Sequence, residues 1–372
     1  MKKLTAPNRN FNLDIIRIIA FLFVPSVHFF LRNGFYSNNV DNMPMYIMTF
    51  MRTLFLLCIP LFLLLTGYLQ GNKKITPDKK YFGKISKFII PYLIVMTIDL
   101  IFIRNVLNWE YTVKQYVENY TSFTHYSWYV EMYIGLFLMI PFLNILWQNL
   151  KTKKQEETLV IVFFILTILP SVFNVYQFDA KDWFSAENDT YWTLFPNWWT
   201  GFYPIAYYFT GAYLAKHKED MKLRPILAFL LFMFTWLMFG TYAVLRCLNT
   251  TASIYSWTNY NSAGIYFMGV TLFFFINSIN FKRVPNLLAR FVGKLSDLTF
   301  GAYLASWCLD QILYTKHINV KIPVMEDRLA VYPLAILLTA TTAFGVSFIV
   351  DLIYKGGQAL WRLTSDKPKK AK

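Results

Sequence analysis

The chain has 372 residues, of which 56% are hydrophobic, 19% aromatic and only 15% charged, and its formal net charge is +15 at pH 7. Soluble domains carry about 25% charged residues, so this composition excludes an ordinary soluble protein and indicates a membrane protein. The positive charge does not indicate nucleic-acid binding, because the lysines and arginines form short clusters between apolar stretches rather than one basic face.

Ten apolar stretches are long enough to cross a bilayer, which takes about 20 residues. They are expected near 13–32, 45–69, 88–107, 125–147, 158–178, 198–215, 225–247, 261–280, 298–315 and 330–354. If the N-terminus is cytoplasmic, 26 lysines and arginines lie in inner segments and eight in outer segments. Cytoplasmic loops are enriched in these residues. The sequence therefore predicts an all-α polytopic membrane protein, a bundle of about ten transmembrane helices with both termini in the cytoplasm.

The domain organisation follows from the loops between these stretches. The longest polar stretch, 179–197, is too short to fold alone, and no repeat of fixed period is present. We expect an integral-membrane domain over residues 1–356 and a basic cytoplasmic tail over 357–372. A cleaved signal peptide is an alternative for the first stretch, but no small-residue cleavage site follows it, and Arg17 stands where the apolar region would begin.

The first apolar stretch contains two ionisable residues, Arg17 and His28, separated by ten others. Eleven helical steps of about 100° place them within roughly 20° of each other and about 16 Å apart along the axis. They therefore share one helix face. An ionisable residue inside a membrane helix is costly and is a candidate for a functional site.

Several fragments carry a family pattern in a fixed order. LDIIRIIAFLFVPSVH (13–28) has an arginine, ten residues and a histidine, and IPLFLLLTGYL (59–69) has a proline, an apolar run that contains a phenylalanine, and Thr-Gly-Tyr. They are followed by KISKFIIPYLI (84–94), SWYVEMYIGLFLMIPFLNIL (127–146) and LSDLTFGAYLASW (295–307). Together these fragments resemble the integral-membrane acyltransferase 3 family. Many members have a histidine after the late Tyr-Leu pair, where this chain has Ser306.

The resemblance implies that an acyl group, most often acetyl from acetyl-CoA, is transferred to a hydroxyl of a cell-surface or lipid-linked glycan. The residue positions agree with such a task. Arg17 lies near the inner boundary, where a guanidinium would hold a CoA phosphate, and the basic residues Lys84 and Lys87 are candidates for the same contact. His28 lies near the outer boundary. An extended pantetheine arm has about the 16 Å length that separates Arg17 from His28.

Four ionisable residues lie within about 10 Å of the predicted outer boundary when depth is counted along each helix. They are His28, Arg52, Glu131 and Asp310. We hypothesise that His28 is a general base for the acceptor hydroxyl or a transient acyl carrier. A carboxylate, Glu131 or Asp310, would orient its ring, and Arg52 would stabilise the oxyanion.

Structural interpretations of these residues remain open. His28 would then be a satisfied buried histidine, and Arg17 would pair with Asp14 at i, i+3. The acids and Arg52 would form ion pairs that hold the bundle together. The basic run around Lys84 and Lys87 would fix orientation by contact with anionic membrane lipids.

The sequence also predicts what the chain does not bind. The four histidines share no zinc-ligand spacing, and Cys58, Cys247 and Cys308 show no disulfide or metal pattern. We expect no metal, and a location in a cell membrane, typically the bacterial plasma membrane. A transporter or flippase for a glycan or small polar substrate is the main alternative, and a structural partner of the glycan-synthesis machinery is a third.

Overall fold

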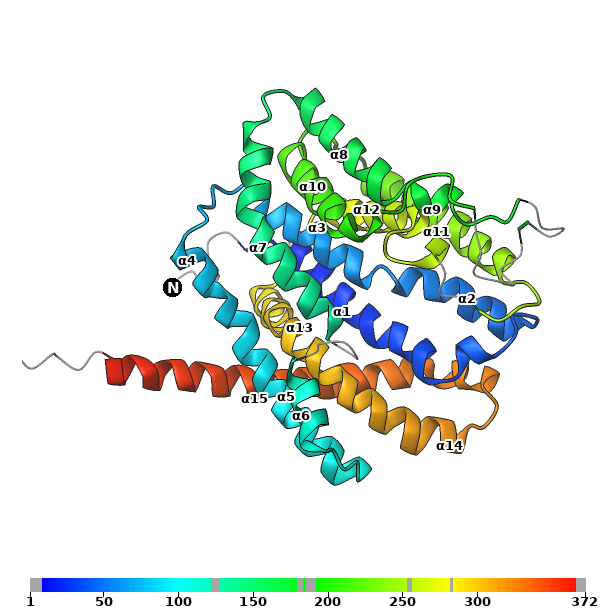
Figure 1. The fold of residues 1–372 in the computed structure, drawn as a ribbon, viewed down its shortest axis with the longest axis vertical. Coiled ribbons are helices and arrows are strands. Elements are labelled where there is room, and N and C mark those ends of the chain that lie inside the picture. The colour runs from blue at the N-terminus through cyan, green and yellow to red at the C-terminus, as the bar shows by residue number, and fades with distance from the viewer. Residues whose placement is uncertain are drawn as a thin grey trace, which may run out of the picture.

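The computed structural model of the chain consists of helices joined by loops (Figure 1). It describes residues 9–121, 127–178, 183–184, 192–252, 256–281 and 284–365. These ranges contain no β-strand and only two isolated β-bridges, Asn39–Thr251 and Val40–Leu248. The all-α class is therefore confirmed for the described part of the chain.

Helix α1 (Phe11–Arg32) begins after Asn10, whose side chain accepts a hydrogen bond from the Asn12 amide and so caps the helix. The second apolar stretch is divided into α2 (Met43–Phe55) and α3 (Cys58–Gln70). Pro60 lies in the first turn of α3, where helical N–H groups lack intrahelical partners, so its missing N–H costs little there.

The remaining helices are given in chain order. The middle of the chain forms α4 (Lys79–Phe82), α5 (Ser86–Leu107), α6 (Val113–Thr121), α7 (Trp128–Asn149), α8 (Lys153–Thr167) and α9 (Pro170–Phe173). The last part forms α10 (Tyr203–Lys216), α11 (Pro225–Arg246), α12 (Ala263–Ser278), α13 (Asn286–Leu313), α14 (Asn319–Lys321) and α15 (Tyr332–Ser365). A π-helical turn, Tyr314–Ile318, lies between α13 and α14.

Each of the ten predicted stretches overlaps a helix or two consecutive helices. Within the described residues, six helical stretches have the length and apolar composition to cross a membrane: Phe11–Ser37, Met43–Gln70, Lys79–Leu107, Trp128–Asn149, Pro225–Arg246 and Glu326–Ala359. The stretch 158–178 is interrupted before Pro170, which cannot continue the hydrogen bonding of α8. The ten-helix bundle and the cytoplasmic position of both termini stay predictions.

The core of the bundle lies around α1, which packs against α3, α13 and α15. In Figure 1, α1 runs through the middle of the bundle, and α15, drawn in red, lies along one edge. Helices α3 and α10 cross in backbone contact. A Cβ on Gly67 would lie 2.0 Å from the Tyr208 carbonyl oxygen, and a Cβ on Gly211 would lie 2.2 Å from that of Leu64. Only glycine fits at these two positions.

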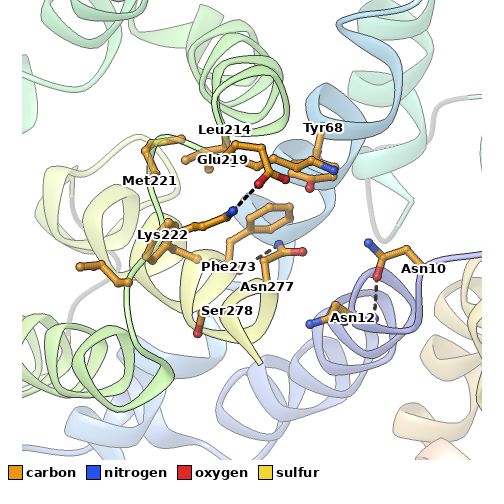
Figure 2. A pocket seen from close by; sticks show the side chains of 13 residues that line it. Asn10, Asn12, Tyr68, Leu214, Glu219, Met221, Lys222, Phe273, Asn277 and Ser278 are labelled. Atoms are coloured by element: carbon orange, nitrogen blue, oxygen red, sulfur yellow. Dashed lines mark hydrogen bonds and ion pairs between the residues drawn. The ribbon is translucent and has the colours of Figure 1, made fainter. Parts of the chain in front are cut away.

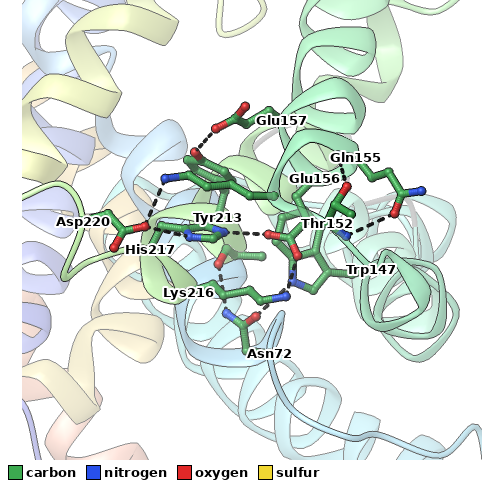
Figure 3. Close-up of polar contacts among 12 residues, drawn as sticks. Asn72, Trp147, Thr152, Gln155, Glu156, Glu157, Tyr213, Lys216, His217 and Asp220 are labelled. Atoms are coloured by element: carbon green, nitrogen blue, oxygen red, sulfur yellow. Dashed lines mark hydrogen bonds and ion pairs between the residues drawn. The ribbon is translucent and has the colours of Figure 1, made fainter.

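The start of α8 is joined to the end of α10 by a cluster of charged side chains (Figure 3). Glu156, whose side chain is 3% exposed, accepts hydrogen bonds from Lys216 Nζ at 2.5 Å and from His217 Nε2 at 2.7 Å. The other ring nitrogen of His217 lies 3.4 Å from Asp220. Burial acts to raise the pKa of Glu156, but the hydrogen bonds from His217 and Lys216 outweigh it and hold the pKa below its ordinary value.

We predict that Glu156→Gln lowers the free energy of unfolding by about 1–3 kcal/mol at pH 7, because glutamine carries no charge and leaves only one acceptor oxygen for Lys216 and His217. A carboxylate with a lowered folded-state pKa stabilises the fold above its unfolded-state pKa, and the stabilisation is lost as the pH falls through the folded-state value. Thermal unfolding in detergent at pH 7 and at an acidic pH below the folded-state pKa of Glu156 measures both effects.

The variant and the wild-type protein should differ clearly at pH 7 and converge at the acidic pH. Glu118→Gln is the control, since Glu118 forms an exposed i, i+4 pair with Lys114 at 3.7 Å, which contributes little. Equal unfolding midpoints for wild type and Glu156→Gln at pH 7 would contradict the prediction.

Candidate functional site

His28 and Asp310 are in direct contact between α1 and α13. His28 Nδ1 lies 2.5 Å from Asp310 Oδ2, and the Asp310 side chain is only 1% exposed. Thr339 of α15 donates a hydrogen bond to the other carboxylate oxygen at 3.5 Å. A carboxylate accepts hydrogen bonds, so Nδ1 donates in this contact and the opposite nitrogen, Nε2, is the one suited to accept a proton.

Arg32 lies one helical turn after His28, at the end of α1. When the side-chain amide of Gln311 is oriented with its oxygen toward Arg32, this oxygen accepts hydrogen bonds from Arg32 Nη2 at 2.7 Å and from Nη1 at 3.0 Å. Gln311 directly follows Asp310 on α13. The end of α1 is thus held to α13 by two consecutive residues of that helix.

Arg17 lies on the same contact between α1 and α13, nearer the start of both helices. Its Nη1 donates a hydrogen bond to Ser296 Oγ at 2.9 Å and lies 3.9 Å from Asp14. Asp14 is instead held mainly by Arg9, whose Nε and Nη2 donate to it at 2.7 and 2.9 Å. The ion pair between Arg17 and Asp14, at i, i+3, is therefore longer than the ion pair between Arg9 and Asp14.

Arg9 also reaches α13, where it donates to Asp297 at 3.0 and 3.1 Å. The hydrogen bond to Asp14, with that to Asp297, raises the pKa of Arg9 above its ordinary value despite partial burial. Because Arg9 occupies both acids, the guanidinium of Arg17 has no carboxylate at hydrogen-bonding distance in the described structure.

A cavity of about 290 Å³ lies beside Arg17, between α1, α3, α5, α7 and α13. Six of its 14 lining residues are aromatic, and hydroxyl, amide and carboxylate groups lie among the rings. The lining residues are Arg17, Phe62, Leu65, Thr66, Leu69, Gln70, Phe88, Tyr129, Tyr133, Ser296, Asp297, Thr299, Phe300 and Tyr303. Among these described residues, Arg17 is the only cation.

The cavity and the His28–Asp310 pair lie along one face of α13. Ser296, Tyr303 and Asp310 follow each other at intervals of seven residues, which places them on one side of a helix. Ser296 and Tyr303 line the cavity, and Asp310 lies about 10 Å beyond Tyr303 along the axis. Tyr303 therefore stands between the cavity and the histidine.

The structure does not bring Glu131 and Arg52 to His28. Glu131, in the first turn of α7, is exposed. Arg52 is 5% exposed, and its Nε donates to the Tyr36 hydroxyl at 2.5 Å while its guanidinium lies 5.2 Å from the centre of that ring. No ion pair joins Arg52, Glu131 and Asp310 in the ranges that the structure describes, so the interpretation of these three residues as an ion-paired group is not supported.

Lys84 and Lys87 are both exposed near the start of α5. The Lys84 ammonium lies 5.5 Å from the centre of the Tyr81 ring. Lys84 precedes Phe88, which lines the cavity, by one helical turn. Neither lysine lines the cavity itself.

Ser306, which occupies the position of the histidine found in many family members, is fully buried. Its hydroxyl donates a hydrogen bond to the Tyr303 carbonyl at 2.8 Å, within α13. No group of three or more metal-ligating side chains is present among the residues described.

A second cavity, of about 300 Å³, lies between the starts of α1 and α11 and the ends of α3 and α12 (Figure 2). Asn10 and Asn12 face it from one side, and Lys222 and Glu219, paired at 2.5 Å, face it from the other. It contains none of the site residues that the sequence predicts.

The sequence analysis missed Arg9 and Tyr303. Arg9 was counted only as a basic residue that fixes orientation, and its two acidic partners are separated by more than 280 residues. The seven-residue spacing of Ser296, Tyr303 and Asp310 was a signal in the sequence that these three residues share one face of the helix.

The comparison with protein families supports the resemblance described above. A family model described as an acyltransferase domain matches residues 10–351, nearly the whole chain. The chain therefore belongs to this acyltransferase family, and the family implies a membrane acyltransferase. Searches of curated proteins and of solved structures gave no match.

We predict that Asp310→Asn lowers the rate of acyl transfer by about 10²-fold or more, because asparagine has no charge to stabilise the His28 imidazolium and its amide N–H favours the wrong ring tautomer. Glu131→Gln is the matched control and should stay within about twofold of wild type. Transfer rates at equal membrane abundance measure the difference. Full activity of Asp310→Asn, or an equal loss in both variants, would contradict the assignment of Asp310.

Proposed function

We propose that the protein transfers an acetyl group from acetyl-CoA to a hydroxyl of a cell-surface or lipid-linked glycan, in a cell membrane that it crosses many times. The observation that carries this proposal is the placement of two sites along one pair of helices. Helices α1 and α13 supply both the Arg17 cavity and the His28–Asp310 pair. This arrangement suits a donor with an anionic head and a long, narrow reactive arm.

The residues around Arg17 fit the donor. Arg17 carries a guanidinium that makes one hydrogen bond at normal distance, to Ser296, so most of its donors remain suited to phosphate oxygens. Thr66, Gln70 and Thr299 supply polar groups along the aromatic wall for the amides of a pantetheine arm. Lys84 lies outside the cavity at the turn before Phe88, where it would add a second cation for the phosphates.

His28 would carry out the proton transfers. Its Nε2 accepts the proton of the acceptor hydroxyl while the oxygen attacks the thioester carbonyl, and Asp310 stabilises the resulting imidazolium. The carbon–sulfur bond then breaks, and the imidazolium returns the proton to the sulfur of the departing CoA thiolate. The products are the acetyl ester and CoA, and His28 is again neutral.

The predicted orientation gives this arrangement a direction. If the basic loops lie in the cytoplasm, Arg17 is near the cytoplasmic boundary, where acetyl-CoA is made, and His28 is near the outer boundary, where an envelope glycan or lipid-linked sugar arrives. The protein would then pass the acyl group across the membrane between two substrates that stay on their own sides. Glycan-synthesis enzymes are the partners that this position favours.

The first experiment is to measure the transfer of labelled acetyl from acetyl-CoA to membrane glycan or lipid in inverted vesicles. Wild type should transfer label, and His28→Ala should not. His317→Ala is the matched control, because His317 is an exposed histidine of the turn after α13. Absence of label with the wild-type protein would contradict the proposal and favour a transporter. Equal label with His28→Ala would contradict the role of His28.

A second prediction separates donor binding from chemistry. Arg17→Gln should raise the KM for acetyl-CoA by about 10-fold or more, the loss expected for one hydrogen bond to a charged group, with a smaller change in kcat. Ser296→Ala is the control, since it leaves the guanidinium in place. A fall in kcat at unchanged KM in Arg17→Gln would show that Arg17 does not bind the donor.

A further inference from the structure

Arg246 is a buried arginine at the end of α11, and no part of the proposed chemistry uses it. It is 1% exposed. The bridges from Asn39 to Thr251 and from Val40 to Leu248 join the residues that follow it to the loop after α1. Arg246 therefore lies at the same end of the bundle as His28, on the side where the acceptor is proposed to bind.

Three aromatic rings surround the guanidinium of Arg246. Its central carbon lies 5.1 Å from the ring centre of Tyr176, 5.2 Å from that of Phe184 and 5.3 Å from that of Trp257. Nη2 donates a hydrogen bond to the Val175 carbonyl at 2.7 Å. These rings stabilise the positive charge, but a ring face does not satisfy the N–H groups that lie in the guanidinium plane.

Two of the nitrogens of Arg246 have no hydrogen-bond partner. Both Nε and Nη1 are buried and unpaired, and so is the indole nitrogen of Trp257 beside them. All three groups are donors, and two of them belong to a permanent cation. Buried donors without acceptors are rare in folded proteins. A ligand that pairs with these three donors would be an anion with several acceptor oxygens.

Exposed aromatic rings lie next to this group. Tyr176 and Phe184 are partly exposed, so the rings that cover the guanidinium lie at the surface. Phe178 and Trp183 are 50% and 47% exposed, and their rings are parallel with centres 6.2 Å apart. Flat, exposed aromatic faces beside a buried cation suit a ligand that has both an apolar face and an acidic group.

We propose that Arg246 and Trp257 bind the carboxylate or phosphate of an anionic sugar acceptor, whose ring packs on the neighbouring aromatic residues. This inference rests on the proposed function, because it assigns the acceptor to the class of acidic glycans. A uronate and a sugar or polyol phosphate share the chemistry that the three donors recognise, namely a compact oxyanion with several acceptor atoms.

The test is the binding of glucuronate and of glycerol phosphate to the purified full-length chain in detergent, measured as a saturable rise of the thermal unfolding midpoint. Glucose and potassium chloride at equal ionic strength are the reference solutes. The wild-type protein should respond to at least one anion and to neither reference. The anion with the lower half-saturating concentration identifies the acidic group.

Two substitutions locate the binding. Trp257→Phe keeps the ring and removes one donor, so the half-saturating concentration should rise about tenfold, and Arg246→Met should show no saturable response. Trp236→Phe is the matched control, because Trp236 lies on α11, as Arg246 does, and its buried indole nitrogen also lacks a hydrogen-bond partner. It should bind as the wild-type protein does.

An equal response to potassium chloride or glucose would overturn the inference, as would wild-type half-saturation in Trp257→Phe. If Arg246→Met does not fold, the half-saturating concentration of Trp257→Phe is sufficient to test the inference. The binding assay needs no acyl donor, so its result does not depend on whether the protein transfers acetyl groups. Binding without acetyl transfer would overturn the transferase, and transfer without binding would overturn only the anionic acceptor.

Discussion

The register between α1 and α13 is the constraint on which the candidate site depends. Three polar contacts fix it: Arg9 with Asp297, Arg17 with Ser296, and His28 with Asp310. A shift of one helical turn, about 5.4 Å, would break all three and leave charged groups unpaired in a medium that offers no substitute. The same contacts that hold the two helices together therefore set the distance between the Arg17 cavity and His28.

The sequence predicted the helices and one end of the site because both follow from periodicity. Arg17 and His28 lie on one face by counting along a helix. Counting depth also placed Asp310 near His28, but depth says nothing about rotation, so Glu131 remained an equal choice. In the structure Glu131 is exposed and Asp310 is buried against the ring. Rotation is set by how neighbouring helices pack, which a single helix does not encode.

Other parts of the site depend on loops and distant pairs. Arg52 contacts Tyr36, which lies in the 3₁₀ turn after α1, and no local pattern predicts where that turn lies. Arg9 is one of many basic residues near the boundary, and its pairing with Asp297 needs the fold to bring the two together. Arg246 is similar: by sequence it is one basic residue at a helix end, and only packing shows it enclosed by rings.

The close crossing of α3 and α10 has a mechanical consequence for the cavity. Their backbones touch at Gly67 and Gly211, so α3 cannot bend away from the cavity without carrying α10 with it. The opposite wall is formed by α5, which packs against α13 and α15, and by α7, which has fewer contacts with other helices. The α3 side of the cavity is thus held more firmly than the α7 side. A long ligand of this cavity would enter by displacing α7, while the register of α1 and α13 stays unchanged.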